Sequence, residues 1–590
     1  MKEVVQNVIK NYFRIIATAL TALFSLTSFF MASFLIYVYL YDIPRYTIIG
    51  EMPASVRGTI EFIRDMPYWI YKIKPVSLPV YRLYIDTDEY QKIIDALPES
   101  GDEVLSDELR KKIPALFVYD GKKMDVKVNL HGDMYNNWIF KKKSWQIRFQ
   151  NGELFDGTSK INLLLPDDEA VYAGEYLNTY RAKKMGLAAP ENKFIVLQIN
   201  DGPKMLYYQK EGWTPEFLVK NFGSSNGNLY GEAGALTDPI FESTMWWKKF
   251  NNVAGEENNF SDLAYLLDLI KNADNAAFKD EIVKIIDMNT FYNWQIHSML
   301  AGSIHQDVTH NMRIYFDKDK KKFFLIVWDV SVWDYIEIGN FERPRFGKVI
   351  YDLDVSYNPL VNRILNIPEF LLERNRRLWE YVKDDTNINE DVAYLDQATE
   401  KIKPAVFQDT QKYDRNGKAD ATMQRVRSNL LNNYAFLREQ LGKSNFFATI
   451  SYQSTSTIAT IDFSYVSASP INFNGLLVSR VSSSPFNNFL LYEDSDRNGR
   501  FDWQDTKIAN LKYENGMLSA RELDLLLYSD RIDNDYYEPI TVRMTDKKFF
   551  VVAPLPFTIQ NPNISFDLFN AITGTIINSL IHVNNRKPFF

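Results

Sequence analysis

The feature that most constrains this chain is a long uncharged segment near its N-terminus. The run from Ile15 to Tyr41 holds only apolar, aromatic, Ser and Thr residues. A helix of this length crosses a hydrocarbon core of about 30 Å with some tilt. A cleaved signal peptide would have a shorter apolar core and a small-x-small cleavage site, and neither is clear here. The run therefore predicts an uncleaved membrane anchor, with a signal peptide as the alternative.

The charges that flank the run predict its orientation. Lys2, Lys10 and Arg14 precede it, and Asp42 follows it directly. Basic residues favour the cytoplasmic side of a membrane, and a long domain that follows a single anchor is generally translocated. We expect a single-pass membrane protein with a cytoplasmic N-terminus and an extracytoplasmic bulk.

Composition excludes several classes of protein. With 590 residues the chain is too long for one compact core. Its net charge of -8 leaves no basic surplus to displace counterions from nucleic-acid phosphates, so no nucleic-acid partner is expected. The absence of cysteine removes disulfides and Cys-ligated zinc, but it does not settle the compartment.

The pattern of residues divides the chain into four segments and predicts an α+β fold. Strand-like alternation, as in Val80 to Ile85, is followed by helical stretches such as Pro359 to Leu365 and Pro368 to Val382. After Lys443 short strands and turn residues predict an all-β domain of sandwich or barrel type. The segments are the tail and transmembrane anchor (1–45), an amphipathic juxtamembrane segment that is helical from Pro53 to Ile73 (46–78), a mixed central domain (79–442) and the β domain (443–590).

A basic block precedes one predicted strand of the central domain. In the stretch from Phe140 to Phe149, Lys143 shares a face with Trp145 and Ile147. A lysine among core residues is costly to bury unless it meets a carboxylate or a phosphate. In protein kinases such a strand lysine holds the nucleotide phosphates and pairs with a helix glutamate. A solvated basic cluster at the start of a strand is the alternative.

A second group of polar residues suits metal-dependent phosphoryl transfer. Asp307 is followed by Asn311, and Asp329 comes at the end of the apolar strand from Phe323 to Val327. In such sites one carboxylate orients the acceptor hydroxyl, while an Asn amide oxygen and a second Asp bind Mg²⁺ or Mn²⁺. Each element alone is weak, because Asp and Asn are common at turns.

The order of these blocks is more specific than any one of them. The ordered set, over roughly residues 79 to 440, resembles the CotH (spore coat protein H) kinase-like family. It comprises His131-Gly132, Lys142 to Trp145, Gly186 to Pro190, Asn200 to Gly202 with Tyr207 and Glu211, Asp307 with Asn311, Trp328-Asp329, Pro359 to Leu365, and Lys403 to Ala405.

The resemblance implies a divergent protein-kinase-like fold that transfers a phosphoryl group from ATP to protein Ser or Thr. It makes Lys143 the nucleotide-phosphate lysine, with Lys142 as the alternative. Two residues, Glu175 and Glu211, are candidates for the acidic partner of that lysine, and the sequence does not choose between them.

The resemblance also implies that Asp307 is the catalytic-loop aspartate and that Asn311 and Asp329 bind Mg²⁺ or Mn²⁺. Three departures from the family pattern bear on activity. The family's Asn-Gly turn is altered here to the sequence from Asn200 to Lys204. His131 stands where the family has Arg, and Ser331 replaces a second aspartate after Trp-Asp.

Three functions remain open at this stage. The first is a membrane-anchored protein kinase acting on a protein substrate. The second is an inactive kinase-like scaffold for cell-envelope or exopolysaccharide assembly, whose β domain binds glycan or protein partners. The third is another transferase on the same fold, which moves a nucleotidyl or amino-acyl group.

A calcium loop is predicted in the β domain. The twelve residues from Asp494 to Asp505 carry oxygen ligands at loop positions 1, 3, 5, 9 and 12, with Gly499 at position 6 for the sharp turn. Strands are predicted on both sides, which favours a structural Ca²⁺ over a signalling one; an acidic turn without metal is the alternative. The predicted ligands are Asp494, Asp496, Asn498, Asp502 and Asp505.

The anchor can be tested directly. Because the run from Ile15 to Tyr41 is long enough to span a bilayer, the mature protein should stay in the membrane fraction after alkaline carbonate washing. A soluble protein whose N-terminus lies beyond Tyr41 would instead establish a cleaved signal peptide.

Overall fold

The fold is described by a computed structural model that covers several ranges of the chain. Residues Pro53 to Arg64 of the predicted juxtamembrane helix, and Ser331, lie outside the described residues. The described ranges are 2–40, 65–98, 105–106, 108–133, 135–138, 142–167, 172–233, 238–251, 255–303, 305–330, 353, 358–412, 414–452, 456–532 and 541–585.

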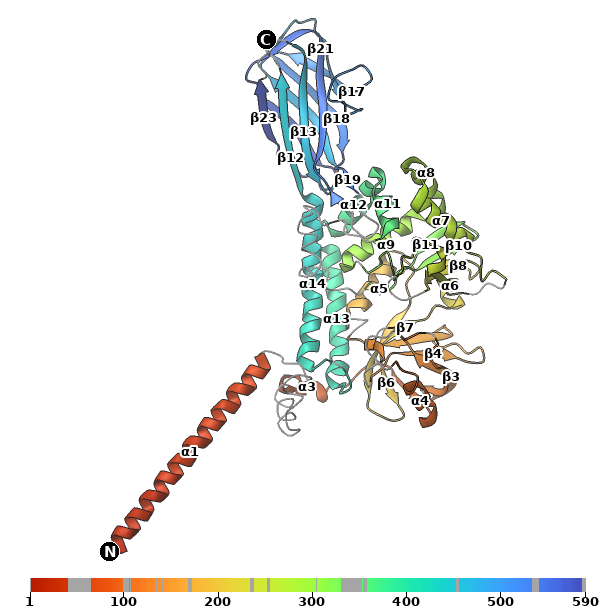
Figure 1. The fold of residues 1–590 in the computed structure, drawn as a ribbon, viewed down its shortest axis with the longest axis vertical. Helices are drawn as coiled ribbons and strands as arrows, with labels where there is room; N and C mark the ends of the chain where they lie inside the picture. The colour runs from red at the N-terminus through yellow and green to blue at the C-terminus, as the bar shows by residue number, and fades with distance from the viewer. Residues whose placement is uncertain are drawn as a thin grey trace.

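The N-terminal helix α1 (Lys2–Leu40) projects from the rest of the chain (Figure 1). Its segment Lys10–Ser33 is long and apolar enough to span a membrane, and none of it is buried. A signal sequence would meet the same criterion, so attachment of the mature chain to the membrane stays a prediction. The next described elements, η1 (Met66–Tyr68) and α3 (Trp69–Lys72), bring Tyr68 and Tyr71 against Phe407.

The first part of the central domain is a closed barrel of seven strands in the order β1-β2-β3-β4-β5-β7-β6. Side chains alternate as the pattern predicts, so Trp145, Ile147 and Phe149 of β4 all point into the barrel core. The strands are β1 (Val80–Tyr84), β2 (Ile113–Tyr119), β3 (Lys122–Leu130), β4 (Trp145–Phe149), β5 (Lys160–Leu164), β6 (Asn192–Ile199) and β7 (Met205–Glu211), with helix α4 (Thr87–Ile94) after β1.

The second part combines a four-stranded sheet, in the order β11-β10-β8-β9, with helices. The predicted helices Pro359–Leu365 and Pro368–Val382 are confirmed as α11 and α12. The remaining elements are α5 (Gly174–Lys184), α6 (Pro215–Phe222), β8 (Asn228–Glu232), β9 (Trp247–Lys249), α7 (Ser261–Asn272), α8 (Asn275–Ile285), α9 (Met288–Ala301), β10 (Ile314–Asp317), β11 (Lys322–Leu325), α13 (Thr386–Gln408) and α14 (Asn416–Gly442), with short 3-10 turns η2 (Tyr135–Asn137) and η3 (Thr244–Trp246).

The C-terminal β prediction is confirmed by a ten-stranded sheet that follows α14 (Figure 1). The sheet folds onto itself, because Phe463 of β13 packs against Phe473 of β14 and Phe566 of β22, which lie near the opposite end of the strand order. The strands are β12 (Ser444–Tyr452), β13 (Ser456–Ser467), β14 (Ile471–Ser479), β15 (Val481–Ser483), β16 (Phe489–Glu493), β17 (Thr506–Glu514), β18 (Met517–Leu527), β21 (Thr545–Ile559), β22 (Ile564–Asn570) and β23 (Leu580–Asn585), with β19 (Arg531–Ile532) and β20 (Thr541–Val542) as a separate pair.

A buried ion pair fixes helix α5 against the long helices α13 and α14. Arg181 Nε lies 2.6 Å from Asp391 Oδ2, and both side chains are 0% exposed. The Tyr434 hydroxyl donates to the same carboxylate oxygen at 2.5 Å, and Arg181 also donates to the carbonyl of Leu300 at 3.1 Å. Since α5 carries a predicted site residue, Glu175, this pair helps to position the site.

Removing Asp391 should destabilise the protein strongly. The change Asp391→Ala leaves the Arg181 guanidinium buried without its carboxylate, at a cost of about 3–5 kcal/mol. The control is Asp396→Ala on the same helix, whose pair with Arg427 is about half exposed and should contribute no more than about 1 kcal/mol. Urea unfolding of the detergent-solubilised chain, followed by tryptophan fluorescence, compares the two, and equal shifts would contradict this assignment.

Candidate functional site

The centre of the site is a buried ion pair between the barrel and helix α5. Strand β7 carries Leu206, Tyr208 and Lys210 on its outer face, and the first two pack into the core that the barrel shares with the helices. Lys210 Nζ lies 3.0 Å from Glu175 Oε1 at the start of α5, and the two side chains are 5% and 4% exposed. Asn178, one turn further along α5, donates to the other Glu175 oxygen at 3.5 Å.

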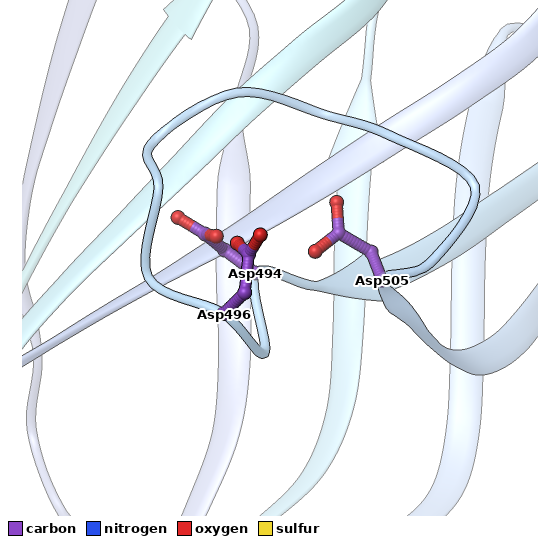
Figure 2. Close-up of side chains that lie close together, drawn as sticks. All are labelled: Asp494, Asp496 and Asp505. Atoms are coloured by element: carbon purple, nitrogen blue, oxygen red, sulfur yellow. The ribbon is translucent and has the colours of Figure 1, made fainter.

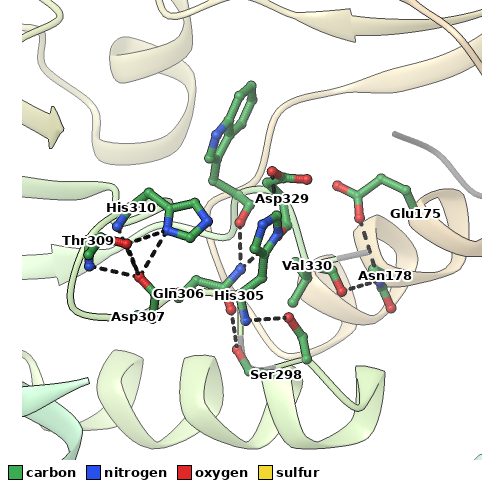
Figure 3. A network of polar contacts seen from close by, with 12 residues as sticks. Glu175, Asn178, Ser298, His305, Gln306, Asp307, Thr309, His310, Asp329 and Val330 are labelled. Atoms are coloured by element: carbon green, nitrogen blue, oxygen red, sulfur yellow. Dashed lines mark hydrogen bonds and ion pairs between the residues drawn. The ribbon is translucent and has the colours of Figure 1, made fainter. Parts of the chain in front are cut away.

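Competing electrostatic effects act on Glu175. Burial raises the pKa of Glu175, the charge and hydrogen bond of Lys210 oppose this, and the nearby negative charge of Asp329 adds to it. The Lys210 ammonium also lies 3.9 Å from the centroid of the ring of Trp328, the residue that precedes Asp329 in the chain. A strand lysine, a helix glutamate and a strand-terminal aspartate therefore converge at one place. Figure 3 shows the two carboxylates of this group, Glu175 and Asp329.

The backbone of Asp329 is held in an uncommon conformation. Its φ is 49°, in the left-handed region, and its carbonyl accepts a hydrogen bond from Gln306 Nε2 at 2.8 Å. His305 Nδ1 lies 3.2 Å from the same carbonyl and 3.5 Å from Oδ2 of the carboxylate. The side chain is 30% exposed, so these contacts fix the backbone and leave the carboxylate accessible.

Asp307 organises the loop between α9 and β10. One oxygen, Oδ1, accepts from the backbone N–H groups of Thr309 (2.7 Å) and His310 (3.1 Å) and from the Thr309 hydroxyl (2.9 Å), and it lies 2.9 Å from His310 Nδ1. Burial opposes ionisation of Asp307, but His310 and Thr309 outweigh it, so the pKa of Asp307 is lowered. Burial likewise disfavours the charged form of His310, but Asp307 prevails and the pKa of His310 is raised.

The loop that carries Asp307 contacts the end of the strand through His305, which lies 3.2 Å from the Asp329 carbonyl. The His305 ring also meets the ring of His310 edge to face, with centroids 4.8 Å apart. Asn311, the next residue, is 7% exposed and has a φ of 62°. Both predicted metal ligands, Asn311 and Asp329, therefore have left-handed backbones, and such conformations in non-glycine residues cluster at functional sites.

The predicted lysines lie elsewhere, which corrects the pairing expected from the sequence. Lys143 lies at the entrance to β4, and its ammonium donates to the carbonyl of Trp138. Lys142 forms a buried ion pair with Asp409 at 2.8 Å and lies 5.0 Å from the centroid of the Tyr207 ring. The physical reason is that α5 covers the outer face of the barrel, whereas β4 directs its apolar side chains inward.

Glu211, the second carboxylate candidate, also has other partners. Its Oε2 forms an ion pair with Lys220 of α6 and accepts a hydrogen bond from the backbone N–H of Glu191 at 3.1 Å. The structure thus brings Glu175, Asp307 and Asp329 together, with Asn311 in the same loop as Asp307. Glu211, Lys142 and Lys143 have other partners and do not belong to this group.

Sequence reasoning missed Lys210. The signal was present, because the alternation in β7 places Lys210 on the same face as Leu206 and Tyr208. The same argument, a lysine among core residues, favours Lys143. Choosing between Lys143 and Lys210 requires knowing which face of which strand packs against helix α5.

The predicted calcium loop lies between β16 and β17 (Figure 2). Carboxylate oxygens of Asp494, Asp496 and Asp505 lie within 4.8 Å of one another, and Gly499 has a φ of 77°. Burial raises the pKa of Asp494, and the neighbouring carboxylates of Asp496 and Asp505 add to this. A hard cation would relieve that repulsion, so the donors fit Ca²⁺. The side-chain amide of Asn498 donates to a carboxylate oxygen of Asp502 at 3.2 Å. This hydrogen bond would have to break for the Asn498 amide oxygen and the Asp502 carboxylate both to bind the metal.

Comparison with known proteins gives one informative match. The family model for "CotH kinase protein" matches residues 128–440 of the 590. No curated protein matches the chain. Among solved structures, a non-cellulosomal cohesin from the hyperthermophilic archaeon Archaeoglobus fulgidus aligns with 11% identity over 25% of this chain and 89% of its own, and its TM-score of 0.13 supports no conclusion. Because the family model spans more than half of its length, this chain belongs to the CotH kinase protein family.

Proposed function

We propose that the central domain is a protein kinase that transfers the γ-phosphoryl group of ATP to a Ser or Thr hydroxyl of a protein. The observation that carries the proposal is the buried Lys210–Glu175 pair beside Asp329. Protein kinases use a strand lysine, paired with a helix glutamate, to hold nucleotide phosphates next to a metal-binding aspartate. A divergent protein-kinase-like fold, as the family implies, would account for this arrangement.

The residues present fit a hard divalent cation. Asp329 offers an accessible carboxylate and Asn311 an amide oxygen, which are ligands that Mg²⁺ and Mn²⁺ prefer. When bound, such an ion neutralises charge on the phosphates. The contribution of the chain is to hold Asp329 through Gln306 and His305, so that its carboxylate stays oriented.

Asp307 would orient the acceptor hydroxyl. Its lowered pKa keeps it ionised at neutral pH, which makes it a weak base but a good hydrogen-bond acceptor. Phosphoryl transfer is largely dissociative and needs little proton abstraction before the new bond forms. The hydroxyl oxygen attacks the γ-phosphorus, the bond to the β-phosphate oxygen breaks, and Asp307 receives the hydroxyl proton late.

The surroundings of this kinase are also part of the proposal. The helix α1 would anchor it, with the N-terminus in the cytoplasm and the remaining domains outside, and Ca²⁺ would stabilise the β domain. Envelope proteins or glycans are the partners that this placement favours. The scaffold alternative rests on Ser331, which replaces an expected aspartate and lies outside the described residues.

Substitutions in the site should separate binding from turnover. Asp329→Ala should abolish Mg²⁺- or Mn²⁺-dependent ATP binding, because it removes the metal ligand. Asp307→Ala should leave binding largely intact and lower turnover by orders of magnitude, because Asp307 acts on the acceptor. Lys210→Met should weaken ATP binding by about 1.5–3 kcal/mol, whereas Lys143→Met should change it little. Calorimetry and labelling with γ-labelled ATP measure these effects, with Asp268→Ala on the exposed face of α7 as control.

Other outcomes would identify the alternatives. An unmodified protein that binds no nucleotide with Mg²⁺, Mn²⁺ or Ca²⁺ would support the scaffold. Transfer of the α-phosphate or of an amino acid, in place of γ-phosphate, would indicate the third function. A loss of binding in Lys143→Met but not in Lys210→Met would restore the assignment made from sequence.

Calcium should stabilise the β domain by binding only to its folded form. The double change Asp494→Ala and Asp496→Ala should therefore lower the melting temperature in Ca²⁺ and have a much smaller effect in chelator. Differential scanning calorimetry in both conditions measures this difference. An unmodified protein that melts at the same temperature with Ca²⁺ and with chelator would remove the loop as a metal site.

A further inference from the structure

The two edge strands of the C-terminal sheet differ in how they are protected against pairing with another chain. The order of strands begins with β22 and ends with β23. An edge strand exposes a row of backbone N–H and C=O groups, and natural proteins guard such rows with charged side chains and β-bulges. Strand β22 carries the exposed Asp567 in its middle, and its register against β14 shifts between Phe473 and Gly475. The β22 edge is therefore doubly protected.

Strand β23, at the other side of the sheet, has neither form of protection (Figure 1). It contains no Lys, Arg, Asp, Glu or Pro between Leu580 and Asn585, and the same holds for the neighbouring strand β12. Its parallel register with β12 is continuous over these six residues, without a bulge. No other strand among the described residues pairs with it. An uncharged and regular sheet edge is therefore open on this side of the domain.

Both faces of this edge carry apolar side chains that a neighbouring strand would cover. Ile581 and Val583 lie opposite core residues of β12, on the inner face of the sheet, yet Val583 is 44% exposed. On the outer face Leu580 lies opposite Phe447, and it is 63% exposed. A regular edge strand with exposed apolar side chains is a site at which another strand adds to the sheet.

The sequence of β23 is complementary to itself in the antiparallel direction. Residues that lie directly opposite one another in an antiparallel pair place their side chains on the same face of the sheet. With His582 on a two-fold axis, Ile581 of each copy lies opposite Val583 of the other, so the apolar inner face continues across the contact. Leu580 then lies opposite Asn584, and no two like charges meet, because the strand has no Lys, Arg, Asp or Glu. A second copy of β23 therefore fits this edge.

We propose that β23 pairs antiparallel with β23 of a second copy of this chain, which joins the two C-terminal sheets across a two-fold axis at His582. The contact uses the same residues on both copies, so it closes as a dimer and does not extend into a fibre. Strand β12 runs parallel to β23 and begins directly after α14. Antiparallel pairing therefore directs the helices and central domains of the two copies toward opposite ends of the joined sheet. This inference does not depend on the proposed kinase function.

Single cysteines can test this pairing, because the chain contains none of its own. Directly opposite residues have Cβ atoms about 4.5–5.5 Å apart, close to the separation of about 3.5–4.5 Å that a disulfide needs. Mild oxidation of the detergent-solubilised full chain with His582→Cys should therefore give a covalent dimer on a non-reducing gel. The control is Ser565→Cys, an exposed position on the protected edge strand β22, which should stay monomeric.

The register can be tested by mixing two variants. Leu580→Cys and Asn584→Cys chains should form a disulfide with each other when they are mixed, because these positions lie opposite one another across the axis. Each variant alone should form far less covalent dimer, since its own two cysteines are then separated along the strands.

A charge on the edge should break the contact. Val583→Lys places an ammonium group against Ile581 of the other copy, and it should weaken association about tenfold or more, because an unpaired charge is costly to bury. Val583→Thr keeps the branched shape without a charge and should largely retain association. Sedimentation of the detergent-solubilised chains measures both, and their melting temperatures show that Val583→Lys remains folded.

Several outcomes would overturn the inference and leave the kinase proposal untouched. One is an unmodified chain that stays monomeric at every concentration while His582→Cys gives no covalent dimer. Another is equal crosslinking of His582→Cys and Ser565→Cys, which would indicate random collision. Dimers that persist undiminished in a folded Val583→Lys chain would be held by another surface, such as α1. Stronger crosslinking of Leu580→Cys alone than of the mixture would exclude the axis at His582.

Discussion

The buried pair between Lys210 and Glu175 is the interaction on which the arrangement of the site depends. Both side chains are almost completely removed from solvent, so each charge is tolerated only because the other is present. The pair joins the outer face of the barrel to the first turn of α5. A change in the packing of this helix would therefore separate the charges at a cost of several kcal/mol.

Two further contacts make α5 a rigid link between the barrel and the strand that carries Asp329. In its middle, Arg181 pairs with Asp391 of α13. Beyond its C-terminal end, Gly186 adopts a φ of 69°, which turns the chain so that Ala188 accepts from the N–H of Val327 at 3.0 Å. The two carboxylates at the centre, Glu175 and Asp329, are thus positioned by backbone and buried contacts at both ends of one helix.

The β domain is joined to the helices by buried polar contacts. Asn375 of α12 donates to the carbonyl of Ala468 at 3.1 Å, and Asn570 of β22 donates to that of Leu441 at 2.9 Å. Val466 and Ala468 also belong to the core that contains α13 and α14. A partner bound to the β domain would consequently be held at a fixed position relative to the central domain.

The sequence by itself determined the α+β class, the apolar N-terminal helix, the C-terminal β domain and the family, because periodicity and the order of motifs are local properties. Helices α11 and α12 begin and end at the predicted residues, since Pro359 and Pro368 mark their first turns. The order of motifs also identified Glu175, Asp307, Asn311 and Asp329 as candidates, because the order of residues along the chain can be recognised without knowledge of the fold.

Only the tertiary structure decided which lysine meets Glu175. Lys143 lies just before β4 and Lys210 lies on β7, and the alternation of side chains places each lysine on the same face as apolar neighbours. The choice depends on which barrel face α5 covers, a contact between residues 35 positions apart in the chain. The position of Arg148 directly opposite Lys160, on β4 and β5, arises in the same way from strand register, which no single strand encodes.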